Sequence, residues 1–429
     1  MENSVKNLIQ FIDHSPSCFH VIENAKKQFL EHGFIQLEEK EHWNLEEGKS
    51  YFVERNGSSM IAFHLPKKDF QGFHIVASHS DSPTYRIKEQ PEMSVEKHYT
   101  KLNTERYGGM IPETWFDRPL SVAGRIIIEE NGQIKDQLVN IDRDLMIIPN
   151  LAIHMSRSSN ESKQLNPQKD LLPLCGGNLT KDGFEEMIAK ESGVEKEDIL
   201  SYDLFLYNRM RGTTLGINEE FVAAPKLDDL ECAYSSIEGM LNAKLSKDYV
   251  TVCAVFDNEE VGSGTKQGAG STFFPEVLKR ISYLCGKNEE EYYMAVADSF
   301  MLSADNAHAV HPNYQDKTDP TNRPYINEGI VLKYNASQKY TTDANSAALV
   351  KYLCKKEKIK CQVFFNRSDM LGGSTLGNIL TGQVSIKAAD IGLPQLSMHS
   401  TYETAGCKDL DDMITLMGSF YELGKEVQI

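Results

Sequence analysis

The sequence predicts an α/β protein with a mostly parallel sheet, interrupted by an inserted domain rich in β-structure. Helix-like and strand-like segments alternate near the start of the chain and again after residue 227, which is typical of a sheet covered by helices. Between these regions, short strand-like pieces and turn residues predominate. A chain of 429 residues is also long for a single core. We therefore expect one α/β domain from residues 1–89 and 225–429, with the inserted domain at 90–224.

The first predicted elements are two helices and three strands. Apolar residues recur at helical spacing over residues 5–13 and 19–30, and the stop and N-cap residues at 15–17 separate them. Strands are predicted at 51–53 and 60–63, joined by a turn at Asn56 and Gly57. Residues 73–78 form an apolar, β-branched run that stops at His79, as a buried strand of a parallel sheet does.

Later elements follow the same two periodicities. A strand is expected at 124–129 in the inserted domain. After it we expect helices at 228–243, 273–284, 346–356 and 409–424, and strands at 249–256, 292–297 and 361–365.

Composition excludes several functional classes. A net charge of −17 offers no basic face for nucleic acid and opposes binding to an anionic membrane. No apolar run approaches the roughly 20 residues that cross a bilayer, and the N-terminus lacks a signal-peptide pattern. The eight cysteines are scattered without a CxxC pair, as reduced thiols usually are. We expect a cytoplasmic protein.

His79 and Asp81 follow the strand at 73–78. If the chain stays extended there, both side chains point to the same side, so Asp81 can bind one imidazole nitrogen while the other binds a metal. The pattern is weak alone, and a surface turn is the alternative.

Glu259 and Glu260 follow the strand at 249–256. Adjacent carboxylates at the end of a buried strand repel each other unless a cation lies between them. One can then bind the metal while the other acts as a base towards water. An acidic surface turn is the alternative for this segment taken alone.

Three further segments carry candidate ligands. Asp228 and Asp229 precede a helix, so N-capping is their default role. Residues 305–314 hold an aspartate and two histidines, and His399 lies near a predicted strand end. Together the five segments fall at or after strand ends, where open α/β sheets place their sites. Their mixture of histidine and carboxylate favours zinc over magnesium, and it is large enough for two ions sharing one carboxylate.

Taken together, these segments resemble the aspartyl aminopeptidase family of co-catalytic zinc peptidases, from residue 15 to the last helix. The matching segments are residues 15–20, 78–83, 114–124, 148–154, 226–229, 256–263 and 304–314. The resemblance implies an α/β/α catalytic domain with an inserted domain used in dimerisation. It also implies dodecamers with enclosed active sites, and cleavage of single residues, preferably acidic, from peptide N-termini.

The resemblance also implies residue roles. Asp228 would bridge two zinc ions in each subunit, with a cis peptide bond to Asp229. His79 and Asp305 would complete the protein ligands of one ion, and Glu260 and His399 those of the other. Glu259 would be the general base, and Asp81 would orient His79. The residues implied in substrate binding are His308, His311, Tyr340, Lys333 and His154. Lys333 would line the pocket for the first side chain of the substrate. His154 would reach the site of a neighbouring subunit.

Two segments depart from the family pattern. Lys226 and Asp229 stand where the family commonly has arginine and asparagine, outside the expected ligands. Residues 368–375 differ more, and we expect them beside the substrate pocket. Two alternative functions stay open. One is a broad-specificity two-metal aminopeptidase or an N-acyl amino acid deacylase on the same scaffold. The other is a metal-free shell or cargo protein, against which the intact carboxylates at 228, 259, 260 and 305 weigh.

Overall fold

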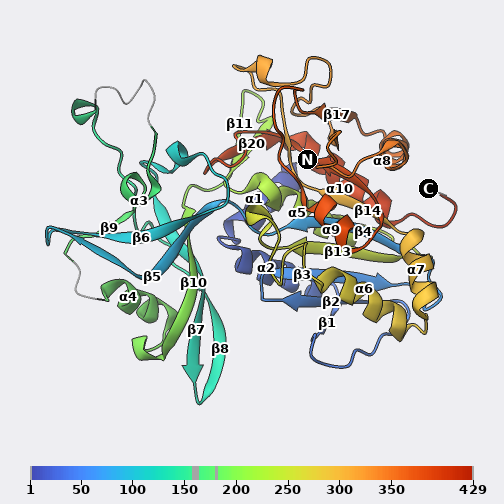
Figure 1. Cartoon of the computed structure of the whole chain (residues 1–429), viewed down its shortest axis with the longest axis horizontal. Coiled ribbons are helices and arrows are strands. Elements are labelled where there is room, and N and C mark those ends of the chain that lie inside the picture. The colour runs from blue at the N-terminus through green and yellow to red at the C-terminus, as the bar shows by residue number, and fades with distance from the viewer. Residues whose placement is uncertain (1, 157–163, 179–181, 428–429) are drawn as a thin grey trace.

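The computed structural model of the chain describes residues 2–156, 164–178 and 182–427. It contains two large bodies joined by a small third sheet (Figure 1). The larger body is built on nine strands, five of whose eight neighbouring pairs are parallel. In sheet order they are β1 (Ile35–Leu37), β2 (Lys49–Arg55), β3 (Ser59–Leu65), β13 (Val250–Phe256), β4 (Phe73–His79), β14 (Phe300–Ala304), β18 (Lys387–Gly392), β16 (Ile330–Tyr334) and β17 (Cys361–Phe365).

Helices cover both faces of this sheet. Side chains of β4 point alternately to the two faces of the sheet, so Ile75 and Ala77 pack into one apolar core and Val76 packs into the other. The helices fall into two groups by the core to which they contribute. The helices of the Val76 side are α1 (Glu2–Asp13), α2 (Cys18–Glu31), α5 (Leu227–Asn242), α8 (Ala344–Glu357) and α10 (Cys407–Tyr421). Those of the other side are α6 (Phe273–Leu284), α7 (Glu289–Ala297) and α9 (Leu376–Gln383). The predicted three-layer α/β/α arrangement is confirmed.

The strand predicted at 292–297 is wrong, because these residues form the second half of α7. A capping box starts the helix: Asn288 accepts a hydrogen bond from the Glu291 amide, and the Glu291 carboxylate accepts one from the Asn288 amide. Tyr292, Ala295 and Val296 then fall on one buried face at helical spacing. The apolar run hid this periodicity, whereas the capping residues reveal it.

The second body is a six-stranded sheet with its own apolar core, in which Trp115 and Phe184 are buried. The chain enters it after β4 (Figure 1). Its strands in sheet order are β8 (Gln133–Asn140), β7 (Leu120–Glu130), β10 (Ile199–Asn208), β5 (Thr84–Val95), β6 (Tyr99–Tyr107) and β9 (Leu174–Gly176), with helices α3 (Pro167–Asp170) and α4 (Gly183–Ser192) beside them.

A five-stranded sheet connects the two bodies. Its strands in sheet order are β11 (Thr213–Leu215), β12 (Phe221–Ala224), β20 (Glu403–Gly406), β19 (Pro394–Leu396) and β15 (Ala307–His308). The second body therefore spans Thr84 to Asn208, and β11 and β12 lie in the connecting sheet although the sequence places them in the inserted range of 90–224. Among the described residues, no helix has the length and apolar character needed to cross a membrane.

His74, on the central strand β4, makes the stability of the large sheet sensitive to acid. His74 is 2% exposed, its ring stacks on Tyr249 with centroids 4.0 Å apart, and its Nδ1 has no hydrogen-bond partner in the described part of the chain. Burial lowers the pKa of His74 to about 3. Below pH 6.5 the unfolded chain binds a proton that the folded protein does not, so stability falls as the pH falls from 6.5 towards 3.

We therefore expect His74→Phe to flatten the pH dependence of stability. Between pH 7 and pH 5 the free energy of unfolding should fall by about 2 kcal/mol less in this variant than in the wild type. Urea denaturation at both pH values measures the difference, and any packing change cancels because it is present at both. His32→Phe, at the exposed end of α2, is the control. Equal slopes for His74→Phe and wild type would contradict the prediction.

Candidate metal centre and active site

The candidate site lies where three parallel strands end. His79 is the last residue of β4, Glu259 and Glu260 follow β13 in a short 3-10 turn, and Asp305 directly follows β14. Strand β4 pairs in parallel with both β13 and β14, so their carboxyl ends meet at one edge of the sheet. This topology brings together side chains that are up to 226 residues apart in the sequence.

Asp228 lies between two histidines at the start of α5. Its Oδ1 is 3.6 Å from His79 Nε2, and its Oδ2 is 3.3 Å from His399 Nε2. The peptide bond from Asp228 to Asp229 is cis, as predicted, and both residues have non-helical backbone angles. The Asp228 carboxylate faces both imidazoles at once.

The ligand atoms form two groups of candidate metal ligands that share Asp228. In each group the atoms lie within 4.8 Å of one another. The first group is His79, Asp228, Asp229 and Asp305, and the second is Asp228, Glu260 and His399. A third group joins His79 to Glu259 and Glu260.

The donor set fits zinc. Ligands about 2.0–2.1 Å from a tetrahedral zinc ion stand about 3.3 Å from one another, and His399 Nε2 is 3.3 Å from Asp228 Oδ2 and 3.4 Å from Glu260 Oε1. Asp228 Oδ1 and Glu260 Oε1 are buried and have no hydrogen-bond partner among the described residues. Buried carboxylate oxygens without partners are costly unless a cation satisfies them.

Asp81 holds several parts of the site together. His79 Nδ1 lies 3.4 Å from Asp81 Oδ1, and so the opposite nitrogen faces Asp228. The Asp81 carboxylate also accepts hydrogen bonds from the amides of Glu259 and Glu260, at 3.1 and 3.2 Å. Tyr107, at the end of β6 in the second body, donates to Asp81 Oδ2 at 2.6 Å. The second body therefore contributes directly to this network.

The site's charges perturb its titrating groups. Burial raises the pKa of Glu259 to about 8, and the nearby Asp305 and Asp81 carboxylates raise it further while His79 lowers it. Burial likewise raises the pKa of Glu260. Burial alone would raise the pKa of Asp228, but the His399 and His79 side chains, 3.3 and 3.6 Å away, hold it below its ordinary value. A bound cation would offset the mutual repulsion of these carboxylates and favour their ionised form.

A cavity of about 270 Å³ reaches Ser397, two residues before the candidate ligand His399. His308, His311 and Tyr314 line one side, and Met370 to Gly373 line another. The divergent segment 368–375 therefore borders this cavity. Burial lowers the pKa of His308, and the Lys333 ammonium lowers it further, which favours a neutral imidazole there.

Lys333 lies beneath this region. Its Nζ donates to the backbone oxygens of Asp305 at 2.6 Å and Asn306 at 3.2 Å, and it lies 3.6 Å from Asp305 Oδ2. Tyr340 covers it, with the ring centroid 5.2 Å from Nζ. Burial alone would lower the pKa of Lys333, but the Asp305 carboxylate raises it above its ordinary value. The side chain is thus a buried, charged ammonium.

His154 is the one predicted site residue that the structure places away from the others. It is exposed in the short 3-10 turn Ile153–Met155 of the second body, and no described contact joins it to the candidate ligands. Such a position is compatible with contact to another subunit.

Sequence reasoning missed three contributors. Glu403, four residues after His399, accepts hydrogen bonds from the amides of Asp228 at 3.0 Å and His399 at 2.6 Å. Asp229 belongs to the first ligand group, although its Oδ2 also accepts a bond from the His79 amide at 3.0 Å. Tyr107 is the third. Only Glu403 had a local signal, its spacing from a candidate histidine ligand.

Comparisons with known proteins identify the family of this chain. A family model described as "Aminopeptidase I zinc metalloprotease (M18)" matches residues 11–421. A "Probable M18 family aminopeptidase 2" of Clostridium acetobutylicum is 46% identical, over 97% of this chain and 98% of that protein. A protein of the same description from Pseudomonas aeruginosa is 37% identical, over 97% of each chain.

Solved structures extend the similarity to the fold. A chain in the cryo-EM structure of the Ape4 and Nbr1 complex matches with a TM-score of 0.95 and 36% identity, covering 98% of this chain and 85% of that one. The S. cerevisiae mApe1 dodecamer matches with a TM-score of 0.85 and 26% identity, covering 98% and 97%. An M18 aminopeptidase from Thermotoga maritima, at 22% identity, has the same fold with a TM-score of 0.88, covering 98% and 96%.

Proposed function

This chain belongs to the M18 family of zinc metalloaminopeptidases, which hydrolyse peptide bonds, and we propose that it removes acidic residues from peptide N-termini with two zinc ions per subunit. The position of Asp228 between His79 and His399 carries the two-ion assignment, because it gives two ligand groups one shared carboxylate. His79 and Asp305 would complete the first ion's protein ligands, and Glu260 and His399 the second's. When bound, two zinc ions make a shared water acidic enough to ionise near neutral pH.

Glu259 is the proposed general base. It follows β13 beside the ligands, and its amide is fixed by Asp81 at 3.1 Å. Its carboxylate would accept the proton of the attacking water and deliver it to the leaving amine. Asp81 would hold His79 in the orientation that directs Nε2 to the metal, and Tyr107 would hold Asp81. A neutral His308, or His311 beside it, would donate a hydrogen bond to the developing oxyanion.

Lys333 is the proposed source of the acidic preference. A protein of net charge −17 repels acidic peptides overall, so selection needs a local cation that discriminates between side chains. Two of the three ammonium protons of Lys333 go to backbone oxygens. The third has Asp305 Oδ2 at 3.6 Å, beyond hydrogen-bond length, and would be the one to bind a substrate carboxylate that reaches past Tyr340.

We expect Lys333→Met to reduce kcat/KM for aspartyl and glutamyl substrates tenfold to a hundredfold more than for leucyl and alanyl substrates. A charge-assisted contact in a partly desolvated pocket contributes roughly 1.5–3 kcal/mol, which corresponds to about that discrimination. Rates on chromogenic substrates of the four residues measure it, with metal content checked in parallel. Lys317→Met, an exposed lysine on the rim of the neighbouring cavity, is the matched control.

Two outcomes would contradict this assignment. An equal loss on all four substrates would give Lys333 a supporting role under Asp305 and leave the acidic preference without a cause. A wild-type enzyme that hydrolyses leucyl substrates as fast as aspartyl ones would make it a broad-specificity aminopeptidase. Neither outcome bears on the two-ion assignment, which elemental analysis tests separately.

The proposed assembly is a dodecamer built from dimers in which His154 enters the partner's site. Its support is the fold shared with the S. cerevisiae mApe1 dodecamer and the exposed position of His154. If the sites are shared, co-expressing His154→Ala with Glu259→Gln should restore about a quarter of wild-type activity. Half of the randomly formed dimers would contain one subunit of each variant. In such a dimer one of the two sites would have both an intact Glu259 and an intact His154. Light scattering checks assembly size. No recovery in mixed assemblies would place His154 outside the shared site.

A further inference from the structure

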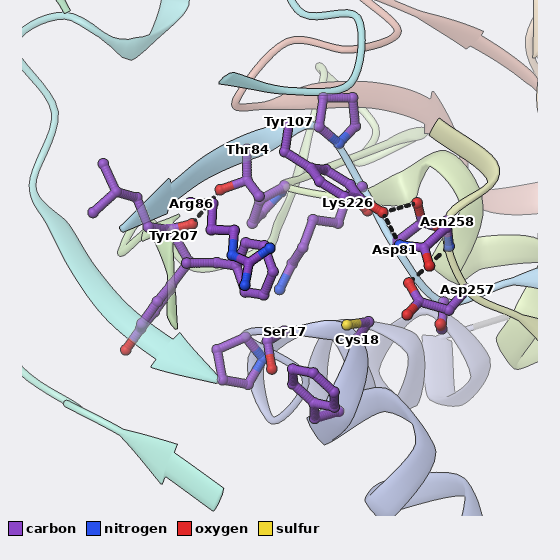
Figure 2. A pocket seen from close by; sticks show the side chains of 18 of the residues that line it. Ser17, Cys18, Asp81, Thr84, Arg86, Tyr107, Tyr207, Lys226, Asp257 and Asn258 are labelled. Carbon is purple, nitrogen blue, oxygen red and sulfur yellow. Dashed lines mark hydrogen bonds between the residues drawn. The ribbon is translucent and has the colours of Figure 1, made fainter. Parts of the chain in front are cut away.

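The motif at residues 114–124 has no role in the proposed reaction, although its first residues lie close to the metal ligands. It begins in the short 3-10 turn Pro112–Trp115 of the second body. The chain reaches this turn from Tyr107, whose hydroxyl donates to Asp81 beside the active site (Figure 2). The residues between Tyr107 and the turn therefore start next to the site.

These residues contact two proposed ligands of the second ion. Gly108 has a φ of +77°, and a Cβ there would lie 3.1 Å from the Cβ of Glu260. A Cβ on Gly109 would lie 3.7 Å from His399 Nδ1. The amide of Ile111 donates to the carbonyl oxygen of His399 at 3.0 Å. The second body therefore packs against Glu260 and His399, the two ligands that are proposed for the second ion alone.

Thr114 joins the same turn to the loop that carries His399. Its hydroxyl accepts a hydrogen bond from the amide of Thr401 at 3.0 Å and donates one to the carbonyl oxygen of Ile111 at 2.8 Å. Its carbonyl oxygen accepts a bond from the Thr401 hydroxyl at 2.7 Å. The carbonyl oxygen of Thr401 accepts a bond from Asn208 Nδ2, also in the second body, at 3.0 Å. Thr114 thus holds the loop of the ligand and also Ile111, which binds the ligand itself.

The backbone of His399 has a conformation that its surroundings must maintain. Its φ is +66°, in the left-handed region that few residues other than glycine adopt. Such conformations persist where neighbouring groups fix them. The amide of His399 donates to Glu403 at 2.6 Å, and its carbonyl oxygen accepts the bond from Ile111. Each of the two bodies therefore fixes one backbone group of this ligand.

The turn that carries Thr114 is firmly packed in the second body. Trp115 is 4% exposed, and its ring meets the ring of Tyr85 edge-on with the centroids 5.1 Å apart. Arg118 Nε donates to the carbonyl oxygen of Thr114 at 2.7 Å and closes the turn. The turn is therefore a fixed part of the second body, against which the loop of His399 can be held.

We propose that Thr114 is a positioning residue for the second zinc ion, acting through Thr401 and Ile111 on the ligand His399. The inference rests on the two-ion function proposed above. Thr401 is 5% exposed, so without the Thr114 hydroxyl its amide would lack an acceptor and the loop would rearrange. The ligands proposed for the first ion alone, His79 and Asp305, end or follow strands of the large sheet and do not depend on this loop.

The test measures zinc affinity, not activity. Thr114→Val keeps the shape of the side chain and removes its hydroxyl. Chelator competition should show one zinc ion per chain bound about tenfold more weakly than in the wild type, while the affinity for the other changes less than twofold. Anomalous diffraction at the zinc edge from partly depleted crystals locates the ion that remains, which should lie at His79 and Asp305.

Three further variants complete the test. Thr114→Ser keeps the hydroxyl and should bind both ions as the wild type does. Thr401→Val removes the reciprocal hydrogen bond and should weaken the same ion. Thr100→Val is the matched control, because it removes a buried threonine hydroxyl elsewhere in the second body, one that donates to the carbonyl oxygen of Gly177 at 2.8 Å. It should leave both affinities unchanged.

The inference and the two-ion assignment can fail separately. Two ions of unchanged affinity in Thr114→Val, the same loss in Thr100→Val, or loss of the ion at His79 and Asp305 would overturn the inference alone. A wild type that holds one zinc ion per chain would contradict the two-ion assignment and the inference with it.

Discussion

Glu259→Gln should lower kcat roughly a hundredfold to ten-thousandfold while zinc content stays at the wild-type level. Glutamine has nearly the same shape and keeps the backbone amide that Asp81 binds at 3.1 Å. It cannot accept the proton of the attacking water, so the loss should appear in kcat and not in metal binding. Steady-state rates on an aspartyl substrate and elemental analysis of the same preparation measure the two quantities separately.

The neighbouring glutamate provides the matched control for this prediction. Glu260 Oε1 lies 3.4 Å from His399 Nε2 and has no hydrogen-bond partner within the described residues, as expected of an oxygen that binds a metal. Glu260→Gln should therefore lose zinc together with activity, and added zinc should restore part of the activity. If Glu259→Gln purifies without metal, the roles of the two glutamates are reversed. If it keeps near-normal kcat, the base is another residue.

The sequence predicted the central part of this molecule because the signals there are local. The apolar run before His79 and the one before Glu259 each describe a buried strand, and the polar residue that ends each run marks the edge of the sheet. Once the strands are parallel neighbours, the ligands meet there without further information. The family resemblance then supplied the roles and the cis bond at Asp228.

The rest depended on contacts between distant segments. Strand β12 pairs with β20 across about 180 residues, and nothing in either short segment specifies the partner. Tyr107 reaches Asp81 from another sheet, and its hydrogen bond leaves no periodic pattern in the sequence. Helix α7 is the exception, because the capping residues Asn288 and Glu291 were visible and the apolar run outweighed them.

After Glu259, Glu403 is the residue whose substitution we expect to have the largest effect on the metal site. It is 2% exposed, and its two carboxylate oxygens accept the amides of Asp228 and His399, the proposed bridging ligand and a ligand of the second ion. It therefore fixes the backbone of two proposed ligands. Burial raises the pKa of Glu403, so these amide bonds are what offset the cost of placing it there.

Glu403→Gln should weaken zinc binding tenfold to a hundredfold, as loss of a group that orients metal ligands typically does. The glutamine NH2 would face one of the two amides, donor against donor, and displace that ligand. Chelator competition should show the weaker affinity, and kcat should recover towards wild type at high zinc. Glu231→Gln is the control, since Glu231 is equally buried but binds the Asn306 side chain and no ligand amide. Unchanged zinc affinity in Glu403→Gln, or the same loss in Glu231→Gln, would show that Glu403 contributes only to packing.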